Sequence, residues 1–306
     1  VTHPDAPGKR FLLKHDDKWK AYGSEAGTAV ANLVTPGTVA VTHTLPSSAF
    51  AGGLGGPTGL VSVQEYSDDV KSLTSLLGGD KYSNDLSSLT PDLMAQILTS
   101  GVSNWLGGDH DGHADQYLVT PDQKLIHIDG GQSYKYTMGH GGDKLALDFN
   151  PNSYVGEAKQ MPIKLLNAIK DGNIDASILD HPMILAAIKR AESLTKTQIQ
   201  QAAAPYLDQT ATPGANLDLL YNRAQTIRAA FETLFSQAKG SPFAFTETAA
   251  DNFDTMPPST PGAPTNFGEL PVGFPKSKFT KWAKTVPNGF QIKIDGKFFI
   301  KKTKYK

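Results

Sequence analysis

The sequence contains no cysteine, few charged residues and no long apolar run, and each absence excludes a class of protein. Without cysteine there is no disulfide framework, no thiolate metal site and no cysteine nucleophile. Charged residues make up 19% of the chain, which is low for a globular protein. No segment approaches 18 apolar residues, and no basic start precedes an apolar stretch. The sequence therefore predicts a soluble protein with no membrane span and no signal peptide.

What is present indicates an ordinary core with many connections. A chain of 306 residues can bury a core without disulfide or metal staples. Its 29 glycines and 20 prolines indicate many turns and long connections. The chain begins with Val1 rather than Met, from which we expect a processed product or a piece cut from a longer polypeptide.

The net charge of −1 is unevenly distributed. Residues 276–306 contain ten lysines and one aspartate, a charge of +9, which leaves −10 for residues 1–275. A basic end of this kind indicates either an anionic partner or a solvated tail whose lysines protect a strand edge. Composition alone leaves both interpretations open.

Hydrophobic periodicity predicts strands early in the chain and helices later. Strands are expected over residues 8–14, 39–45 and 60–66, with a helix over 24–34 whose N-cap would be Ser24. Spacings of three and four residues predict further helices over 68–78, 91–106, 161–170, 180–193, 195–204 and 215–238.

These elements predict an α+β fold in four parts. Residues 1–66 form a small unit of strands and one helix, and residues 67–250 form a larger, mainly helical unit. Residues 251–275 are rich in Pro, Thr and Gly and indicate a linker. The basic tail, 276–306, would end in a hairpin in which an Asp-Gly turn joins QIKI to KFFI.

The chemistry is concentrated in residues 105–133, which read WLGGDHDGHADQYLVTPDQKLIHIDGGQS. The runs 116–119 and 124–129 predict a hairpin, because the TPDQ between them has the residues of a tight turn. Such a hairpin would bring Asp129 back beside the loop that precedes its first strand. Acidic, amide and imidazole side chains could then converge on one point.

Four of these side chains match the needs of phosphoryl transfer. That reaction requires a carboxylate on Mg²⁺, a second oxygen ligand for the metal, and a base or charge-stabilising group near the attacking hydroxyl. The residues that could supply these groups are Asp111, His113, Gln116 and Asp129.

At this point the sequence resembles a known family. DGHADQ followed by IDGG resembles the D-x-H-x-x-N … I-D-x-G signature of the phosphatidylinositol 3- and 4-kinases and their bacterial relatives. GQSYKY at 131–136 and DKLALDFNPNSYVGE at 143–157 add to the resemblance, which covers roughly residues 9–157. It implies a two-lobed, protein-kinase-like fold with a β-rich N-lobe and a mainly helical C-lobe. It also implies phosphoryl transfer that depends on ATP and on Mg²⁺ or Mn²⁺.

On the nucleotide side, the resemblance implies roles for two short segments. Lys14, which ends the strand FLLK, would contact the ATP phosphates, and Glu25 in the next helix would pair with it. Gln64, Glu65 and Tyr66 end a strand where the hinge to the adenine would lie.

On the catalytic side, the resemblance implies that Asp111 and His113 serve the phosphate acceptor, and either could be the base. Gln116 and Asp129 would hold the metal ion. The acceptor is left open by these motifs, so a protein, a lipid and a small molecule all remain candidates.

The sequence departs from the family pattern in three places. Gly112 stands where the family usually has Arg, and Gln116 stands where it has the metal-binding Asn. Mg²⁺ demands near-ideal octahedral geometry, so the longer arm of Gln116 could weaken or reshape the site. Only thirteen residues precede Lys14, too few for the usual glycine-rich strand pair, although the glycine loop at 51–59 could replace part of it.

Two other functions remain open. Gln116 is compatible with a catalytically weak or inactive kinase-like module that binds nucleotide or has a structural role in a larger assembly. Alternatively, a metal-dependent hydrolase could bind Zn²⁺ or a metal pair through Asp109, His110, Asp111 and His113. Ordinary structural roles are also open, such as a turn residue for Asp129 and a helix-dipole charge for Glu25.

Overall fold

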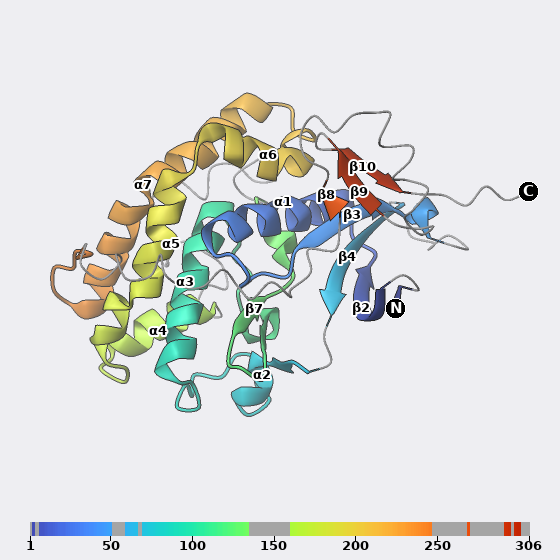
Figure 1. The fold of residues 1–306 in the computed structure, drawn as a ribbon. Helices are drawn as coiled ribbons and strands as arrows, with labels where there is room; N and C mark the ends of the chain where they lie inside the picture. Colours follow the sequence, from blue (N-terminus) through green and yellow to red (C-terminus); the bar gives the residue numbers. More distant parts are fainter. Residues whose placement is uncertain are drawn as a thin grey trace, which may run out of the picture.

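The computed structural model describes the chain and its side chains over residues 11–50, 59–65, 69–134 and 160–246, and the backbone of short strands elsewhere at 2–3, 6–10, 66, 268–269, 291–294 and 297–300. The fold is of the α+β class, with small sheets set against a larger group of helices (Figure 1). The predicted fold class is confirmed at this level.

A four-stranded sheet in the order β1-β2-β4-β3 forms one end of the molecule. Its strands are β1 (Thr2–His3), β2 (Ala6–Lys14), β3 (Thr42–Pro46) and β4 (Leu60–Tyr66). All neighbours are antiparallel, and Lys14 lies opposite Ser62. Side chains alternate along β4, so Val61 and Val63 pack with Leu45 in a small apolar cluster. The intervening positions, Ser62 and Gln64, therefore belong to the opposite face.

Helix α1 (Lys18–Val34) lies between this sheet and the other helices (Figure 1). It begins six residues earlier than predicted, because the Asp17 side chain accepts hydrogen bonds from the backbone N–H groups of Trp19 and Lys20 at 3.0 Å. The predicted N-cap, Ser24, is instead buried inside the helix. The first turn lacks a clear apolar stripe, so periodicity placed the start too late.

Helices make up most of the remaining described chain. They are α2 (Leu73–Leu76), α3 (Pro91–Gly107), α4 (Met161–Lys170), α5 (Pro182–Ser193), α6 (Lys196–Leu207) and α7 (Pro213–Lys239). The last five confirm the predicted helices to within a few residues at each end. The predicted helix over 68–78 is wrong, because Lys71 and Ser72 form strand β5 and only one helical turn, α2, follows.

Two strands after α3 form the predicted hairpin. They are β6 (Tyr117–Val119) and β7 (Leu125–His127), which pair antiparallel, while β5 pairs with the other edge of β6. The backbone N–H of Ala40 donates to the carbonyl oxygen of His127, and the backbone N–H of His127 donates to the carbonyl oxygen of Thr38. These two bonds connect the hairpin to the segment that leads into β3.

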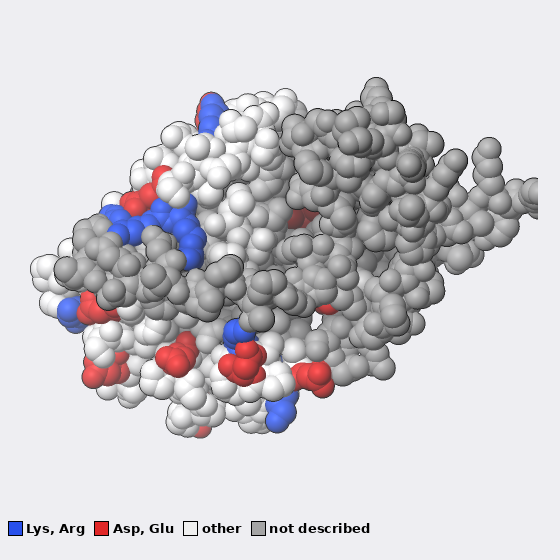
Figure 2. All heavy atoms as spheres, viewed as in Figure 1, with Lys and Arg blue, Asp and Glu red and all other residues white. Residues whose placement is uncertain are grey.

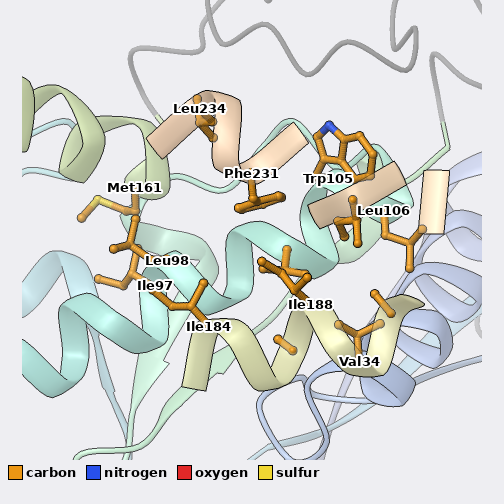
Figure 3. Close-up of a cluster of buried hydrophobic side chains, with 14 of the residues drawn as sticks. Val34, Ile97, Leu98, Trp105, Leu106, Met161, Ile184, Ile188, Phe231 and Leu234 are labelled. Atoms are coloured by element: carbon orange, nitrogen blue, oxygen red, sulfur yellow. The ribbon is translucent and has the colours of Figure 1, made fainter. Parts of the chain in front are cut away.

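The helical part is built on one large core. Figure 3 shows side chains from α1, α3, α4, α5 and α7 interlocking in its centre. Those labelled are Val34, Ile97, Leu98, Trp105, Leu106, Met161, Ile184, Ile188, Phe231 and Leu234. Because α1 contributes to this core and also packs on β3 and β4, it connects the sheet to the helices.

The tail contains the predicted hairpin. Strands β9 (Gln291–Ile294) and β10 (Lys297–Ile300) are antiparallel, with Lys297 opposite Ile294, and β8 (Gly268–Glu269) pairs parallel to β9. The tail's lysine side chains, most of the predicted linker and the motif residues 135–157 lie outside the described residues.

On the face shown in Figure 2, acidic and basic side chains lie interspersed among uncharged ones. Among the described residues, Arg228 forms an ion pair with Glu192 at 2.8 Å. Within the described part of the chain, no helix is both long enough and apolar enough to cross a bilayer.

Candidate functional site

The β6–β7 hairpin delivers Asp129 to the loop that precedes it. The backbone N–H of Ile128 donates to the carbonyl oxygen of Gln116 at 2.8 Å, so the residue before Asp129 is bonded to the residue before β6. This return of the chain confirms the hairpin geometry that the sequence predicted. It places Asp129 next to the acidic loop over residues 107–116.

Asp129 meets Lys14 from the sheet. The Lys14 Nζ donates to Asp129 Oδ2 at 2.7 Å, although the two residues are 115 positions apart. Their side chains are 31% and 38% exposed, so the pair lies at the edge of solvent. Asp129 has a φ of 60° and ψ of 55°, a left-handed conformation that non-glycine residues seldom adopt. Strained backbone of this kind is held in place only by well-packed surroundings.

The pair closes one side of a small pocket of about 10 Å³. Residues from β2, β3, β4, α1 and the Asp129 turn line it: Leu12, Lys14, Asp16, Ser24, Thr42, Ser62, Gln64 and Asp129. The pocket therefore joins three residues that the sequence assigned to one site, namely Lys14, Gln64 and Asp129.

The sheet provides a polar wall to this pocket. The Gln64 side-chain amide donates to Ala40 O at 2.9 Å and to Thr42 Oγ1 at 3.3 Å, which fixes its orientation. The Ser62 hydroxyl is buried and has no hydrogen-bond partner among the described residues. A buried hydroxyl without a partner is unfavourable by about 1–3 kcal/mol. A polar ligand in the pocket would remove that penalty.

A second group of predicted residues surrounds His113. The backbone N–H of Asp115 donates to His113 Nδ1 at 3.2 Å, so a neutral His113 carries its proton on Nε2. That nitrogen lies 3.7 Å from Asp111 Oδ1 and 3.4 Å from the Gln116 amide nitrogen. Two N–H donors cannot bond to each other, so the favourable orientation of Gln116 turns its amide oxygen toward His113. Asp111 is the more exposed member, at 41% against 13% for His113.

Residues that the sequence did not single out lie against this group. The Tyr82 ring packs edge-on against His113, with ring centroids 6.1 Å apart. Asp115 accepts a hydrogen bond from Thr74 Oγ1 at 2.5 Å and lies 3.6 Å from the Lys81 ammonium. These contacts come from α2 and from the segment between α2 and α3, and no local pattern in the sequence predicts them.

Asp109 is a buried residue of the loop over residues 107–116, and its side chain bonds to the backbone of that loop. Its Oδ1 accepts a hydrogen bond from the backbone N–H of Asp111 at 3.0 Å. Burial raises the pKa of Asp109 to about 7. Asp109 and His127 line a second cavity of about 10 Å³, separate from the pocket beside Lys14. The His127 ring is stacked on Tyr117 with ring centroids 4.8 Å apart, and burial lowers the pKa of His127 to about 4.

The remaining predicted nucleotide-side residues are more dispersed. Glu25 is buried within α1, and the partner that the structure gives to Lys14 is Asp129, where the resemblance implied Glu25. Glu65 is exposed on β4. Tyr66 ends β4 as predicted, but its side chain lies outside the described residues.

The hydrolase hypothesis receives no support from the geometry. Over the side chains described, no three His, Asp or Glu residues are grouped so that they could hold a metal ion. Asp109 is buried and accepts from the backbone N–H of Asp111, whereas the Asp111 carboxylate lies 3.7 Å from His113, so the two carboxylates have different partners.

Two comparisons with known proteins, one against family models and one against curated sequences, found no match.

Proposed function

We propose that the protein transfers a phosphoryl group from ATP, with Mg²⁺ or Mn²⁺, as an atypical kinase of the phosphatidylinositol 3- and 4-kinase-like type. The observation that carries the proposal is the 2.7 Å contact between Lys14 and Asp129. Motif resemblance assigned one to the ATP phosphates and the other to the metal. Lys14 and Asp129 are 115 positions apart in the sequence and yet lie in contact. A site that binds the phosphates and the metal ion together requires two such groups to be close.

The arrangement of elements supports a two-lobed, kinase-like fold. The sheet carries Lys14 and Gln64, and the helical part carries Asp111, His113 and Asp129, so the proposed site lies where the two parts meet. Helix α1 follows the Lys14 strand and packs on both parts. This is consistent with an N-lobe over residues 1–66 and a C-lobe over 67–250.

The nucleotide would bind in the pocket beside Lys14. Its volume of about 10 Å³ is far below the several hundred Å³ typical of ligand sites, so binding requires that the pocket open. Lys14 would release Asp129 and turn to the phosphates. The Ser62 hydroxyl and the Gln64 amide offer polar partners on the same face of the sheet, beside Lys14.

Asp111 is the group best placed to accept the proton of the attacking hydroxyl. His113 Nδ1 already accepts from the Asp115 backbone, and its Nε2 carries a proton, so the imidazole is a donor rather than a base. His113 would help to position Asp111, whose Oδ1 lies 3.7 Å from the His113 Nε2. The acceptor, whether protein, lipid or small molecule, would approach past Asp111, which is the more exposed of the two.

The donor set is compatible with a hard divalent ion. Asp129 Oδ2 already contacts a cation, the Lys14 ammonium, and Gln116 can offer an amide oxygen. These two residues would hold the ion, which would neutralise charge on the phosphates. The chain's own contribution is to position the nucleotide and the acceptor.

A second candidate is nucleotide binding with little or no turnover. It is favoured by the contact between the Gln116 amide and His113 at 3.4 Å, which engages the side chain needed for the metal. Gln116→Asn separates the two candidates. The shorter amide should preserve or raise activity if residue 116 holds the ion during transfer.

The test is incubation with labelled ATP and Mg²⁺ or Mn²⁺, scoring self-labelling, hydrolysis and transfer together. Asp129→Asn and Lys14→Met should each lower the rate by about 10²-fold or more, because each removes a charge that acts on the phosphates. Asp122→Asn, in the exposed hairpin turn, is the matched control and should be unaffected.

Calorimetry distinguishes the outcomes. ATP binding without transfer would leave the binding module as the function. Absence of both binding and transfer in the wild-type protein would exclude the kinase proposal and the binding proposal together.

A further inference from the structure

The segment that follows Asp129 lies directly on helix α1. A Cβ added at Gly27 would overlap with Ser133 Oγ and lie 2.6 Å from Ser133 Cβ, closer than such atoms approach in proteins. Glycine inside a helix is unfavourable by about 1 kcal/mol relative to alanine. The close approach of Ser133 is therefore a physical reason for glycine at position 27.

The same segment is anchored on its other side. The backbone N–H of Tyr134 donates to Gly107 O at 2.8 Å, at the end of α3. The Tyr134 hydroxyl donates to Ala26 O of α1 at 3.2 Å. Ser133 itself closes a turn, since its N–H donates to Gly130 O at 3.0 Å. The turn is thus held between two helices within five residues of Asp129.

Helix α1 also holds the sheet that carries Lys14. The Thr44 hydroxyl on β3 donates to Ala21 O at 2.9 Å, and the backbone N–H of Thr42 donates to the Thr28 hydroxyl at 3.0 Å. Strand β3 pairs with β4, which pairs with β2 and Lys14. One helix is therefore in contact with both supports of the Lys14–Asp129 pair.

We propose that Gly27 and Ser133 are positioning residues for the proposed phosphoryl transfer: the seating of Ser133 on Gly27 sets the spacing between Asp129 and Lys14. The inference rests on the proposed function for its catalytic meaning. The spacing itself is a property of the chain and can be measured without nucleotide.

The first measurement is steady-state kinetics of Gly27→Ala with ATP and metal. The added methyl group pushes Ser133 and the Asp129 turn away from α1, and kcat/KM should fall by about 10²-fold, as expected for a displacement near 1 Å. Adding Ser133→Gly removes both clashing atoms and should restore kcat/KM to near the wild-type value. Adding Ser133→Ala should not restore it, because the Cβ atoms would still lie 2.6 Å apart.

The second measurement reads the geometry alone. The chain has no cysteine, so Ser24→Cys with Gly131→Cys creates a unique pair. A Cβ at Gly131 lies 3.3 Å from Ser24 Oγ, close to disulfide geometry. The pair should cross-link readily under mild oxidation. Gly27→Ala should slow cross-linking by about tenfold or more, and Ser133→Gly should restore the rate.

Controls separate this effect from general loss of packing. Gly214→Ala, in α7, adds a methyl group that meets nothing within 4 Å and should change neither readout. The inference is overturned if folded Gly27→Ala matches wild type in cross-linking, or if Ser133→Gly fails to restore the rate. A double variant that does not fold also overturns it, because the clash would not be the cause of the defect.

The two proposals can fail separately. A wild-type protein that neither binds nor turns over ATP rejects the proposed function, while cross-linking still reports how closely the Asp129 turn is seated on α1. An active protein whose cross-linking ignores Gly27 rejects the inference alone.

Discussion

Asp109 and His127 line the same small cavity, and burial disfavours the charged form of each. The folded-state pKa of Asp109 is raised from 3.8 to about 7, so its contribution to stability is lost as pH rises from about 4 to about 7. The folded-state pKa of His127 is lowered from 6.5 to about 4, so stability is lost as pH falls through that range. The two effects oppose each other between about pH 4 and 6.5.

Replacing one of the two groups should reveal the pH dependence of stability that the other group causes. Asp109→Asn keeps an oxygen that can accept from the Asp111 N–H but removes the ionisable carboxyl. Its free energy of unfolding should therefore rise with pH between about 4 and 6.5 more steeply than that of the wild type. The difference should amount to a few kcal/mol at most, since one unit of pKa corresponds to about 1.4 kcal/mol.

Urea denaturation at a series of pH values measures this difference, and His127→Gln supplies the reciprocal control. Its unfolding free energy should fall more steeply with rising pH than that of the wild type. Parallel pH profiles for wild type and Asp109→Asn would show that the carboxyl is not held neutral by burial.

At the scale of elements, the end of α3 depends on a buried arginine from α7. Arg223 is completely buried and donates to the carbonyl oxygens of Trp105 and Leu106 in the last turn of α3. Its guanidinium also lies 4.3 Å from the centre of the Trp105 indole. A cation at a helix C-terminus is favourable, and a planar guanidinium can serve two carbonyls and a ring together. This contact supports the helix end from which the loop over 108–116 departs.

Arg223→Lys should therefore be costly despite the conserved charge. An ammonium cannot bond both carbonyls and stack on Trp105, and each buried carbonyl left without a partner is unfavourable by about 1–3 kcal/mol. The matched control is Arg228→Lys in the same helix, a part-exposed residue paired with Glu192, where a change below about 1 kcal/mol is expected. Chemical denaturation of both variants checks the prediction, which fails if the two lose similar stability.

Element boundaries show what the sequence could and could not predict. Helices α3 to α7 followed from apolar spacing because their stability comes from one face packed on the core. The start of α1 at Lys18 was missed, since it depends on the Asp17 cap rather than on a stripe. Strand β5 was mistaken for helix, because its two residues are extended only through pairing with β6.

At the scale of the whole molecule, the apolar interior is unequal in its two parts. The helices share a large cluster that includes Ile188, whereas Val61, Val63 and Leu45 form a much smaller one under the sheet. Regions with few buried apolar contacts open at lower free energy than the global core. The sheet that carries Lys14 should therefore be the more readily opened part.

Val61→Ala and Ile188→Ala test this asymmetry by hydrogen exchange. Val61→Ala should speed exchange in β2, β3 and β4 while leaving α3, α5 and α7 protected. Ile188→Ala should lower the free energy of opening for amides in both the helices and the sheet by about 2–5 kcal/mol, as is typical of large-to-small changes in a main core. If Val61→Ala speeds hydrogen exchange in the helices as much as in the sheet, the two clusters open together.

The candidate site shows the same division between local and long-range information. The meeting of Asp129 with the loop at Gln116 was predictable, because a short hairpin connects them. The approach of Lys14 was expected only from motif resemblance, since no local rule relates positions 115 residues apart. Tyr82 and Ser62 were missed, because their places beside the site depend on the packing of separate elements.

The Lys14–Asp129 contact has a consequence for how the site would be filled. The Lys14 ammonium is a cation that the chain itself supplies to Asp129, so it occupies this position whatever ions the solution contains. A divalent ion that arrived alone would have to displace the Lys14 ammonium from Asp129, and it would leave that ammonium without a negative partner. A nucleotide arriving with its ion already bound brings the exchange partner for each, anionic oxygens for the lysine and a cation for the aspartate. If the protein is the proposed kinase, joint arrival of nucleotide and ion would therefore be the electrostatically balanced route.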